Sequence, residues 1–152
     1  MSDDANKRVV QRAYLDGMNG KDPAVIEECF AADYVCHFPA DQGEVRGIVD
    51  FKATLLDFLN AFDNLVFTVE QLLADGDRVV LRWSARGEHT GDYKGLPPTR
   101  VIPATGKEIS MSATDIYRVV DGRIVEEWNT FDGYHVLHQM GALTIHGDEP
   151  TS

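Results

Sequence analysis

The sequence has little of what marks several large classes of protein. Only 2 of its 152 residues are cysteines, Cys29 and Cys36, too few for a disulfide scaffold or a four-ligand zinc site. Lys and Arg number 14 against 25 Asp and Glu, and a formal charge of −11 argues against binding to a nucleic-acid backbone. The sequence has no apolar run of the ~20 residues that cross a bilayer and no secretory signal pattern, so we expect a cytoplasmic protein without a membrane partner.

Several common catalytic motifs are also missing. The sequence has no GxGxxG, GxxxxGK[ST], GxSxG or HExxH, which removes support for nucleotide binding by those loops and for α/β-hydrolase or zinc-protease chemistry. His135 and His138 are spaced as i and i+3 on a predicted helix, but no carboxylate motif accompanies them, and a solvated or dimer-facing pair is the simpler interpretation. We predict neither a metal nor another cofactor.

The pattern that is present indicates one α+β domain. The length fits a single domain, which we place at residues 1–146, with 147–152 as a flexible tail. Helical spacing of apolar residues predicts helices over 4–19, 22–30 and 51–62, with a short strand at 34–38 between the last two. Beyond them, β-rich runs joined at Asp75-Gly76 and Asp121-Gly122 predict two hairpins, and a last helix begins near residue 134. Helices followed by long hairpins indicate a cone-shaped, curved antiparallel sheet wrapped around helices.

Alternation along the strands predicts which side chains face the interior of this cone. A two-residue turn at Asp121-Gly122 would place three pairs of residues opposite each other on one face: Tyr117–Glu126, Asp115–Trp128 and Met111–Asp132. We take this face as the concave one, although a β-bulge would exchange the two faces. By the same rule Trp83 and His89 alternate with Val79 and Leu81 in the preceding hairpin, and His37 with Val35 in the short strand.

A carboxylate in such surroundings could act as a base. Its ordinary pKa near 4 makes it a weak base at neutral pH, but desolvation raises that pKa. We hypothesise that Asp132 removes a proton next to a carbonyl, while His89, His37 or Tyr117 donates a hydrogen bond to the developing oxyanion. The alternative for Asp132 is a helix cap, because it directly precedes a predicted helix.

The two histidines and the large aromatic residues named above could also have purely structural roles. His89 could bond to backbone in a glycine-rich turn, and His37 could be a core histidine with satisfied hydrogen bonds. Core or pocket-wall positions are more typical of large aromatic side chains than chemical roles. This applies to Tyr14, Trp83, Tyr117 and Trp128.

Three stretches, ADYVCHFP, GDRVVLRWSARGEHTGDYKGLPPT and DGRIVEEWNTFDGYHVLHQMGAL, resemble the SnoaL-like polyketide cyclases of the nuclear transport factor 2-like superfamily. The resemblance implies cofactor-free enzymes of antibiotic biosynthesis that close a ring by intramolecular aldol condensation. It places the acid/base on Asp132, and pocket histidines on His89, within GxHxG, and on His37. It also implies a small hydrophobic carbonyl-containing substrate and a homodimer or homotetramer. Residues Arg100 to Thr105 are extra relative to the family pattern.

Alternatives remain open because one fold can support many functions. A ketosteroid-isomerase-like or epoxide-hydrolase-like enzyme would use the same pocket and a buried acid. A domain without catalytic activity, which binds a small hydrophobic ligand or dimerises, would need no acid of unusual pKa.

Overall fold

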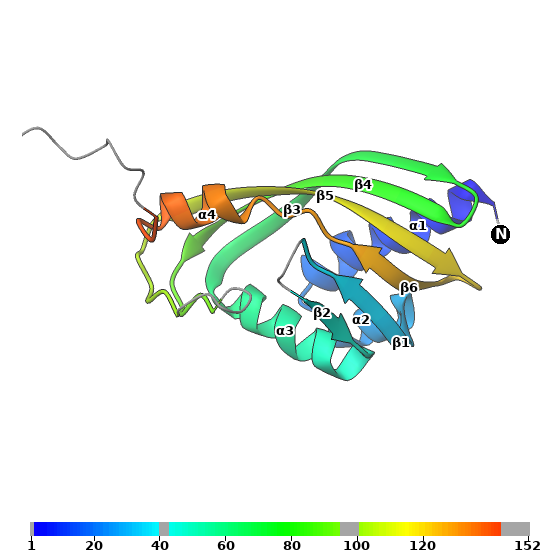
Figure 1. Cartoon of the computed structure of the whole chain (residues 1–152), viewed down its shortest axis with the longest axis horizontal. Helices are drawn as coiled ribbons and strands as arrows, with labels where there is room; N and C mark the ends of the chain where they lie inside the picture. The colour runs from blue at the N-terminus through cyan, green and yellow to red at the C-terminus, as the bar shows by residue number, and fades with distance from the viewer. Residues whose placement is uncertain (1, 40–42, 95–100, 144–152) are drawn as a thin grey trace, which may run out of the picture.

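The computed structural model describes residues 2–39, 43–94 and 101–143 (Figure 1). Its helices are α1 (Asp3–Arg12), the π-helical η1 (Ala13–Met18), α2 (Pro23–Cys29), α3 (Ile48–Asn60) and α4 (Gly133–Gln139). Its strands are β1 (Phe30–His37), β2 (Glu44–Arg46), β3 (Phe62–Asp75), β4 (Arg78–His89), β5 (Glu108–Val120) and β6 (Arg123–Trp128). The tail predicted at 147–152 lies outside the described residues.

Local signals explain where the helices begin. The side chain of Ser2 accepts a hydrogen bond from the amide of Ala5 at the start of α1, and Asp22 does the same for Ala24 at the start of α2, where Pro23 occupies the first turn. The first predicted helix is present but changes from α to π geometry at η1. Helices α1 and α2 therefore begin where their capping residues place them, whereas α3 begins at Ile48, before the predicted start at Phe51, and has no side-chain cap.

The six strands form one sheet in the order β2-β1-β6-β5-β4-β3. Both predicted hairpins are present, and positive φ angles at Gly76 (60°), Asp121 (49°) and Gly122 (76°) form the tight turns between their strands. The pair β1–β6 is parallel, whereas the other neighbouring strands are antiparallel. Pairing of β1 with β6 joins the first quarter of the chain to its end, and strand β2 was not predicted.

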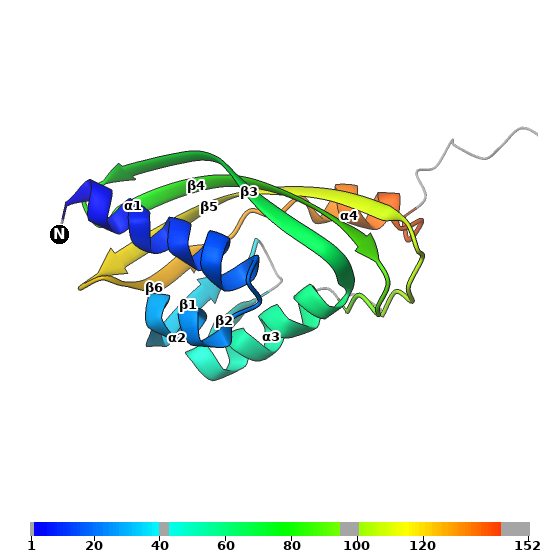
Figure 2. The same ribbon diagram turned by 180° about the vertical axis from the view of Figure 1, so that it is seen from behind.

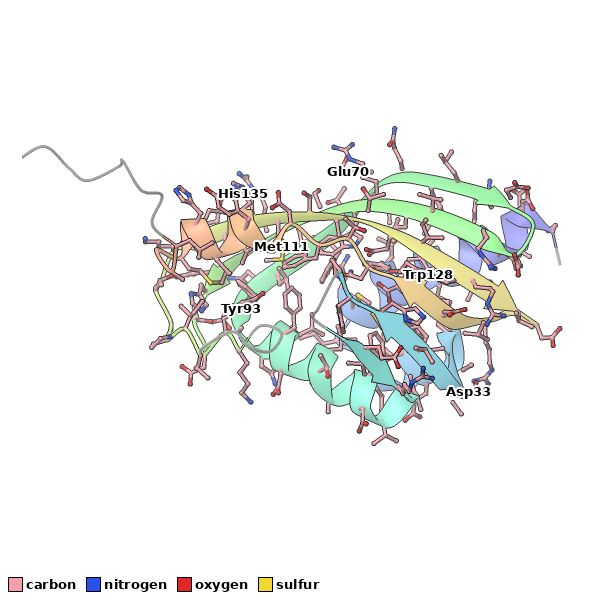
Figure 3. All side chains as sticks on the ribbon, viewed as in Figure 1. Asp33, Glu70, Tyr93, Met111, Trp128 and His135 are labelled. Carbon is pink, nitrogen blue, oxygen red and sulfur yellow. The ribbon has the colours of Figure 1, made fainter. Side chains whose placement is uncertain are left out.

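The sheet is strongly bent, and α1, α2 and α3 lie on one side of it (Figures 1 and 2). Helix α4 lies at the end of the sheet where β5 begins, opposite the end that carries the N-terminus. The side chains of Met111 and Tyr93 lie between the sheet and α3, whereas those of Glu70 and His135 point outward, away from α3 (Figure 3). The predicted cone-shaped α+β fold is therefore confirmed. None of the helices in the described part of the chain is long and apolar enough to span a membrane.

Candidate active site

The inner face of β4 and β5 holds the side chains that were predicted there. Trp83 and His89 of β4 are buried, as are Met111, Asp115 and Tyr117 of β5. The two strands pair without a register shift along their whole shared length. Simple alternation therefore predicted this part of the interior correctly.

The predicted register of β5 with β6 is wrong beyond its first two pairs. The observed pairs are Tyr117–Glu127 and Ile116–Trp128, in place of the predicted Tyr117–Glu126 and Asp115–Trp128. The cause is a β-bulge or similar irregularity between Arg118 and Val119. Because successive side chains of a strand point to opposite faces, this shift turns Glu127 inward and leaves Trp128 on the outer face.

His37 also lies on the outer face and not in the predicted pocket. Its ring stacks on Trp128 with the centroids 5.6 Å apart, Nε2 lies 2.9 Å from Oε1 of Glu126, and Nδ1 lies 3.2 Å from Oε2 of Glu44. Tyr34 occupies an inner position of β1 instead and is fully buried. The apolar alternation of Tyr34, Cys36 and Phe38 in the sequence was the signal that could have found it.

Asp132 is exposed and caps helix α4. Its Oδ1 accepts a hydrogen bond from the amide of His135 at 3.1 Å, which is the capping role considered from the sequence. The amide of Asp132 donates to the carbonyl oxygen of Ser112 at 3.1 Å, so the predicted pairing with Met111 is wrong by one residue. The structure does not bring Asp132 together with the buried polar groups of the inner face.

The most strongly hydrogen-bonded of these groups is Asp115. Its Oδ2 accepts from Nε1 of Trp83 at 2.7 Å, and its Oδ1 accepts from Nδ2 of Asn129 and from the amide of Thr130, both at 3.0 Å. Burial raises the pKa of Asp115, and these donors oppose that effect because they stabilise the anion. The site therefore provides a desolvated carboxyl group whose hydrogen bonds come from β4 and from the segment that follows β6.

Glu127 is the second buried carboxyl group, and sequence reasoning missed it. Asn129 links it to Asp115, since Nδ2 lies 3.4 Å from Oε1 of Glu127 and 3.0 Å from Oδ1 of Asp115. The Tyr34 hydroxyl donates to its other oxygen. Burial, together with the charge of Asp115, raises the pKa of Glu127 to about 8. Asp115 and Glu127, which we call the acid pair, are close enough to influence each other's titration, and burial raises the pKa of both.

Two tyrosines complete the polar network of the acid pair. The hydroxyls of Tyr14 and Tyr117 are 2.5 Å apart, and each lies 3.3 Å from Oδ2 of Asp115. Tyr117 is also 3.3 Å from Oε1 of Glu127. Burial raises the pKa of both tyrosines, so both remain neutral donors. Tyr14 comes from η1, and π-helical turns occur frequently at functional sites.

An aromatic cluster joins the acid pair to His89. Trp83 stacks on Phe131 with centroids 6.1 Å apart, and Phe131 packs edge-on against Phe58 at the same distance. Phe58 contacts Phe62, which lies 5.7 Å from the ring of His89. The inner face thus consists of a polar part around the acid pair and an apolar, aromatic part towards His89.

The glycines of the GxHxG stretch have a packing reason. A Cβ at Gly91 would lie 2.5 Å from the carbonyl oxygen of Asn60, and one at Gly87 would lie 3.0 Å from Leu65. Any larger residue would push the strand away from β3 and α3. The motif therefore holds the backbone around His89 close to its neighbours.

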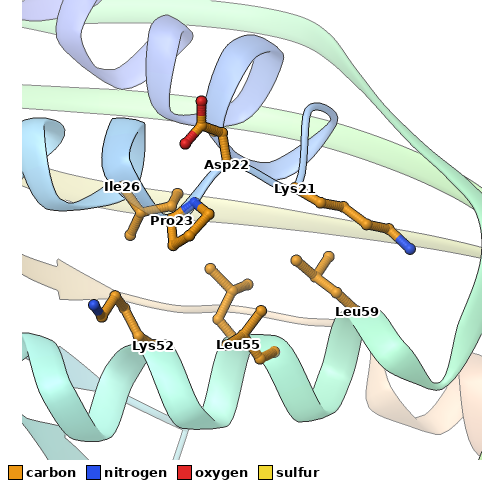
Figure 4. A pocket seen from close by; sticks show the side chains of 9 residues that line it. Lys21, Asp22, Pro23, Ile26, Lys52, Leu55 and Leu59 are labelled. Carbon is orange, nitrogen blue, oxygen red and sulfur yellow. The ribbon is translucent and has the colours of Figure 1, made fainter.

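Two surface hollows lie apart from the acid pair. One lies between α2 and α3 and is lined by residues that include Lys21, Ile26, Leu55 and Leu59 (Figure 4). The other is lined by α1 residues with Glu28, Cys29 and Gly122. Within the described residues, no three His, Cys, Asp or Glu side chains are placed to hold a metal ion.

Comparison with known proteins agrees with this architecture. The family model of the SnoaL-like polyketide cyclases matches residues 8–140. The chain belongs to the SnoaL-like polyketide cyclase family. A search of curated proteins found no match.

Solved structures of the SnoaL-like type superimpose over nearly the whole chain. IdmH, a presumed polyketide cyclase from Streptomyces antibioticus, is 28% identical with a TM-score of 0.74, over 90% of this chain and 98% of that one. AclR, a presumed hydroxylase from Streptomyces galilaeus, is 26% identical with a TM-score of 0.79, over 94% and 100%. A presumed SnoaL-like cyclase from Jannaschia has a TM-score of 0.81 at 21% identity, over 93% and 95%, which shows the fold alone.

Proposed function

We propose that this SnoaL-like protein is a cofactor-independent polyketide cyclase that closes a ring by intramolecular aldol condensation. The observation that carries the proposal is the acid pair, two carboxyl groups buried inside the cone and linked by Asn129. Carboxyl groups whose pKa is raised by burial can act as acid/base catalysts at neutral pH, and such groups gather at active sites.

The acid pair has the parts that an aldol closure requires. A carboxylate, Asp115, would remove a proton from the carbon next to a carbonyl, and the enolate carbon would then form a bond to a second carbonyl carbon of the same molecule. The resulting alkoxide would take up a proton, which Glu127 can supply because its pKa is about 8. Neutral Tyr14 and Tyr117 would donate hydrogen bonds to the enolate oxygen.

The resemblance gives a different location for the acid/base, Asp132. We favour the acid pair because Asp132 is exposed, its Oδ1 accepts from the first turn of α4, and it does not lie with the buried polar groups of the inner face. Both locations remain proposals that one experiment can separate.

The experiment is deuterium uptake from heavy water, followed by mass spectrometry on a panel of β-keto esters, anthraquinone-type polyketide esters and ketosteroids. We expect uptake that falls by about 100-fold or more in Asp115→Asn, a typical loss for an acid/base residue, and stays high in Asp132→Asn. Asparagine also caps helices, so the second variant keeps α4 intact. Glu126→Gln, next to Glu127 but on the outer face, is the matched control.

Full uptake by Asp115→Asn together with loss in Asp132→Asn would move the chemistry to the surface position. No uptake by the wild-type protein with any compound would overturn the proposed enolisation and favour a binding domain or an epoxide-opening enzyme.

A ketosteroid-isomerase-like activity is the second candidate, because hydrogen-bonded tyrosines beside a buried carboxyl group of raised pKa suit the stabilisation of a dienolate. In that enzyme the same proton is returned to another carbon of the substrate. A shift of the double bond in a ketosteroid, without ring closure of the polyketide esters, would support it.

We also propose a homodimer or homotetramer that forms through the outer face of the sheet. Leu73 of β3, Val80 of β4 and Ile116 of β5 are neighbours there, and Leu73 is 64% exposed. Leu73→Lys should lower the molar mass measured by light scattering. An unchanged mass would exclude this face as the interface.

A further inference from the structure

The extra segment of the chain contacts His89. The structure describes Val101 to Thr105 of the six extra residues, and Ile102 in this segment forms an antiparallel bridge with Tyr93, with N–O distances of 2.8 and 2.9 Å. Three residues further on, Thr105 lies against the imidazole ring of His89. The extra residues are therefore part of the inner site at its aromatic end.

Thr105 offers two donors to Nδ1 of His89. Its amide donates to Nδ1 at 3.3 Å, and its Oγ1 lies 3.0 Å from the same nitrogen. The amide of Lys107 donates to Oγ1 of Thr105 at 3.3 Å, so the hydroxyl accepts there and has its own hydrogen free for Nδ1. A nitrogen that accepts hydrogen bonds carries no proton, and in a neutral imidazole the proton must then be on Nε2.

That Nε2 is buried without a partner. His89 is 0% exposed, and its Nε2 is the one buried side-chain polar atom of the described residues that has no hydrogen bond. The rings of Phe62 and Tyr93 lie near it, with centroids 5.7 and 6.5 Å from the imidazole.

Burial lowers the pKa of His89 and so favours the neutral ring. The backbone of Gly91 and of Ile102 and the charge of Asp92 oppose this effect, but none of them forms a hydrogen bond to Nε2. Buried donors are normally paired, so an unpaired Nε2–H is available to donate to a ligand.

We propose that Thr105 is a positioning residue, which holds His89 in the Nε2–H tautomer so that Nε2–H donates to a carbonyl or enolate oxygen of a ligand bound at the aromatic end of the cone. The aromatic surroundings favour a flat apolar ligand. The net charge of −11 favours a neutral carbonyl compound over a free carboxylate. The identity of the ligand as a substrate rests on the proposed function, whereas the tautomer does not.

Nitrogen-15 NMR of protein with labelled histidines tests the tautomer directly at neutral pH. The spectrum of His89→Gln assigns the resonances by difference. We expect a protonated Nε2 and an unprotonated Nδ1 for His89 in the wild-type protein. A protonated Nδ1, alone or in an imidazolium, would overturn the proposal.

Variants of Thr105 test its role. Loss of one hydrogen bond to Nδ1 in Thr105→Val should raise the population of the other tautomer roughly fivefold, the effect of a typical hydrogen bond, and Thr105→Ser should restore the wild-type spectrum. Thr68→Val, at an exposed position of β3, is the matched control. An unchanged His89 spectrum in Thr105→Val would refute the positioning role.

Ethyl benzoylacetate, a flat aromatic β-keto ester, probes the donor. We expect its addition to shift the Nε2–H proton resonance, and we expect His89→Gln, which keeps an N–H at a similar place, to bind it at least tenfold more tightly than His89→Leu. No shift of that resonance would overturn the donor role even if deuterium uptake occurs. A shift without deuterium uptake in any compound would instead overturn the proposed function and leave this inference standing.

Discussion

Glu127→Gln should weaken the pH dependence of stability. In the unfolded chain the pKa of Glu127 is near 4.5, and in the folded protein burial raises it to about 8. The folded state therefore binds more protons than the unfolded state between these values, and its free energy of unfolding falls as pH rises. With about 1.4 kcal/mol for each pH unit, the wild-type protein should lose about 5 kcal/mol between pH 4.5 and pH 8.

A loss of that size is comparable to the whole stability of many domains. Glutamine has a similar shape and carries no charge at any pH. Glu127→Gln should therefore be about as stable as wild type at pH 5 and clearly more stable at pH 9. A smaller slope in the same direction should remain, because the pKa of Asp115 is also raised.

Urea unfolding followed by circular dichroism from pH 5 to pH 9 measures this dependence. Glu126→Gln is the control, because the hydrogen bond from His37 lowers the pKa of Glu126. The stabilising effect of that carboxylate is present above its unfolded pKa and is lost only as pH falls through its folded pKa, so this variant should keep the wild-type slope. A wild-type stability that is constant or rises from pH 5 to pH 9 would refute the reasoning, as would an equally steep fall in Glu127→Gln.

Three further changes follow from contacts of single residues. Asp115→Asn should lower the free energy of unfolding measured in urea at pH 7 by about 2–4 kcal/mol, because an amide side chain can accept hydrogen bonds at only one of its two end atoms. No loss would mean that the hydrogen bonds to Asp115 do not stabilise the fold. Gly91→Ala should lower the free energy of unfolding by about 1–3 kcal/mol, because the new Cβ would lie 2.5 Å from the carbonyl oxygen of Asn60. Gly133→Ala is the control in thermal melts, because the nearest contact of its Cβ is at 3.8 Å. Asp132→Ala should lower the free energy of unfolding by about 1 kcal/mol, because it removes the cap of α4, whereas Asp132→Asn should leave it almost unchanged. Equal losses in the two variants would exclude the capping role.

Much of the fold could be predicted from local sequence. The Asp-Gly turns, the caps at Asp22 and Asp132 and the apolar spacing of the helices all act within a few residues, so their signals are complete in the sequence. The inner face of β4 and β5 also followed from alternation, because these strands pair without a shift. Trp83, Asp115 and Tyr117 were therefore placed correctly.

The acid pair depended on tertiary structure. The register shift next to Arg118 turned Glu127 inward, and no residue type in this stretch signals such a shift. The parallel pairing of β1 with β6 then brought the buried Tyr34 against Glu127 across 93 positions of sequence. Sequence by itself thus determined the elements and most of the faces of this protein, whereas the partners of its buried carboxyl groups were decided by long-range packing, which local patterns do not encode.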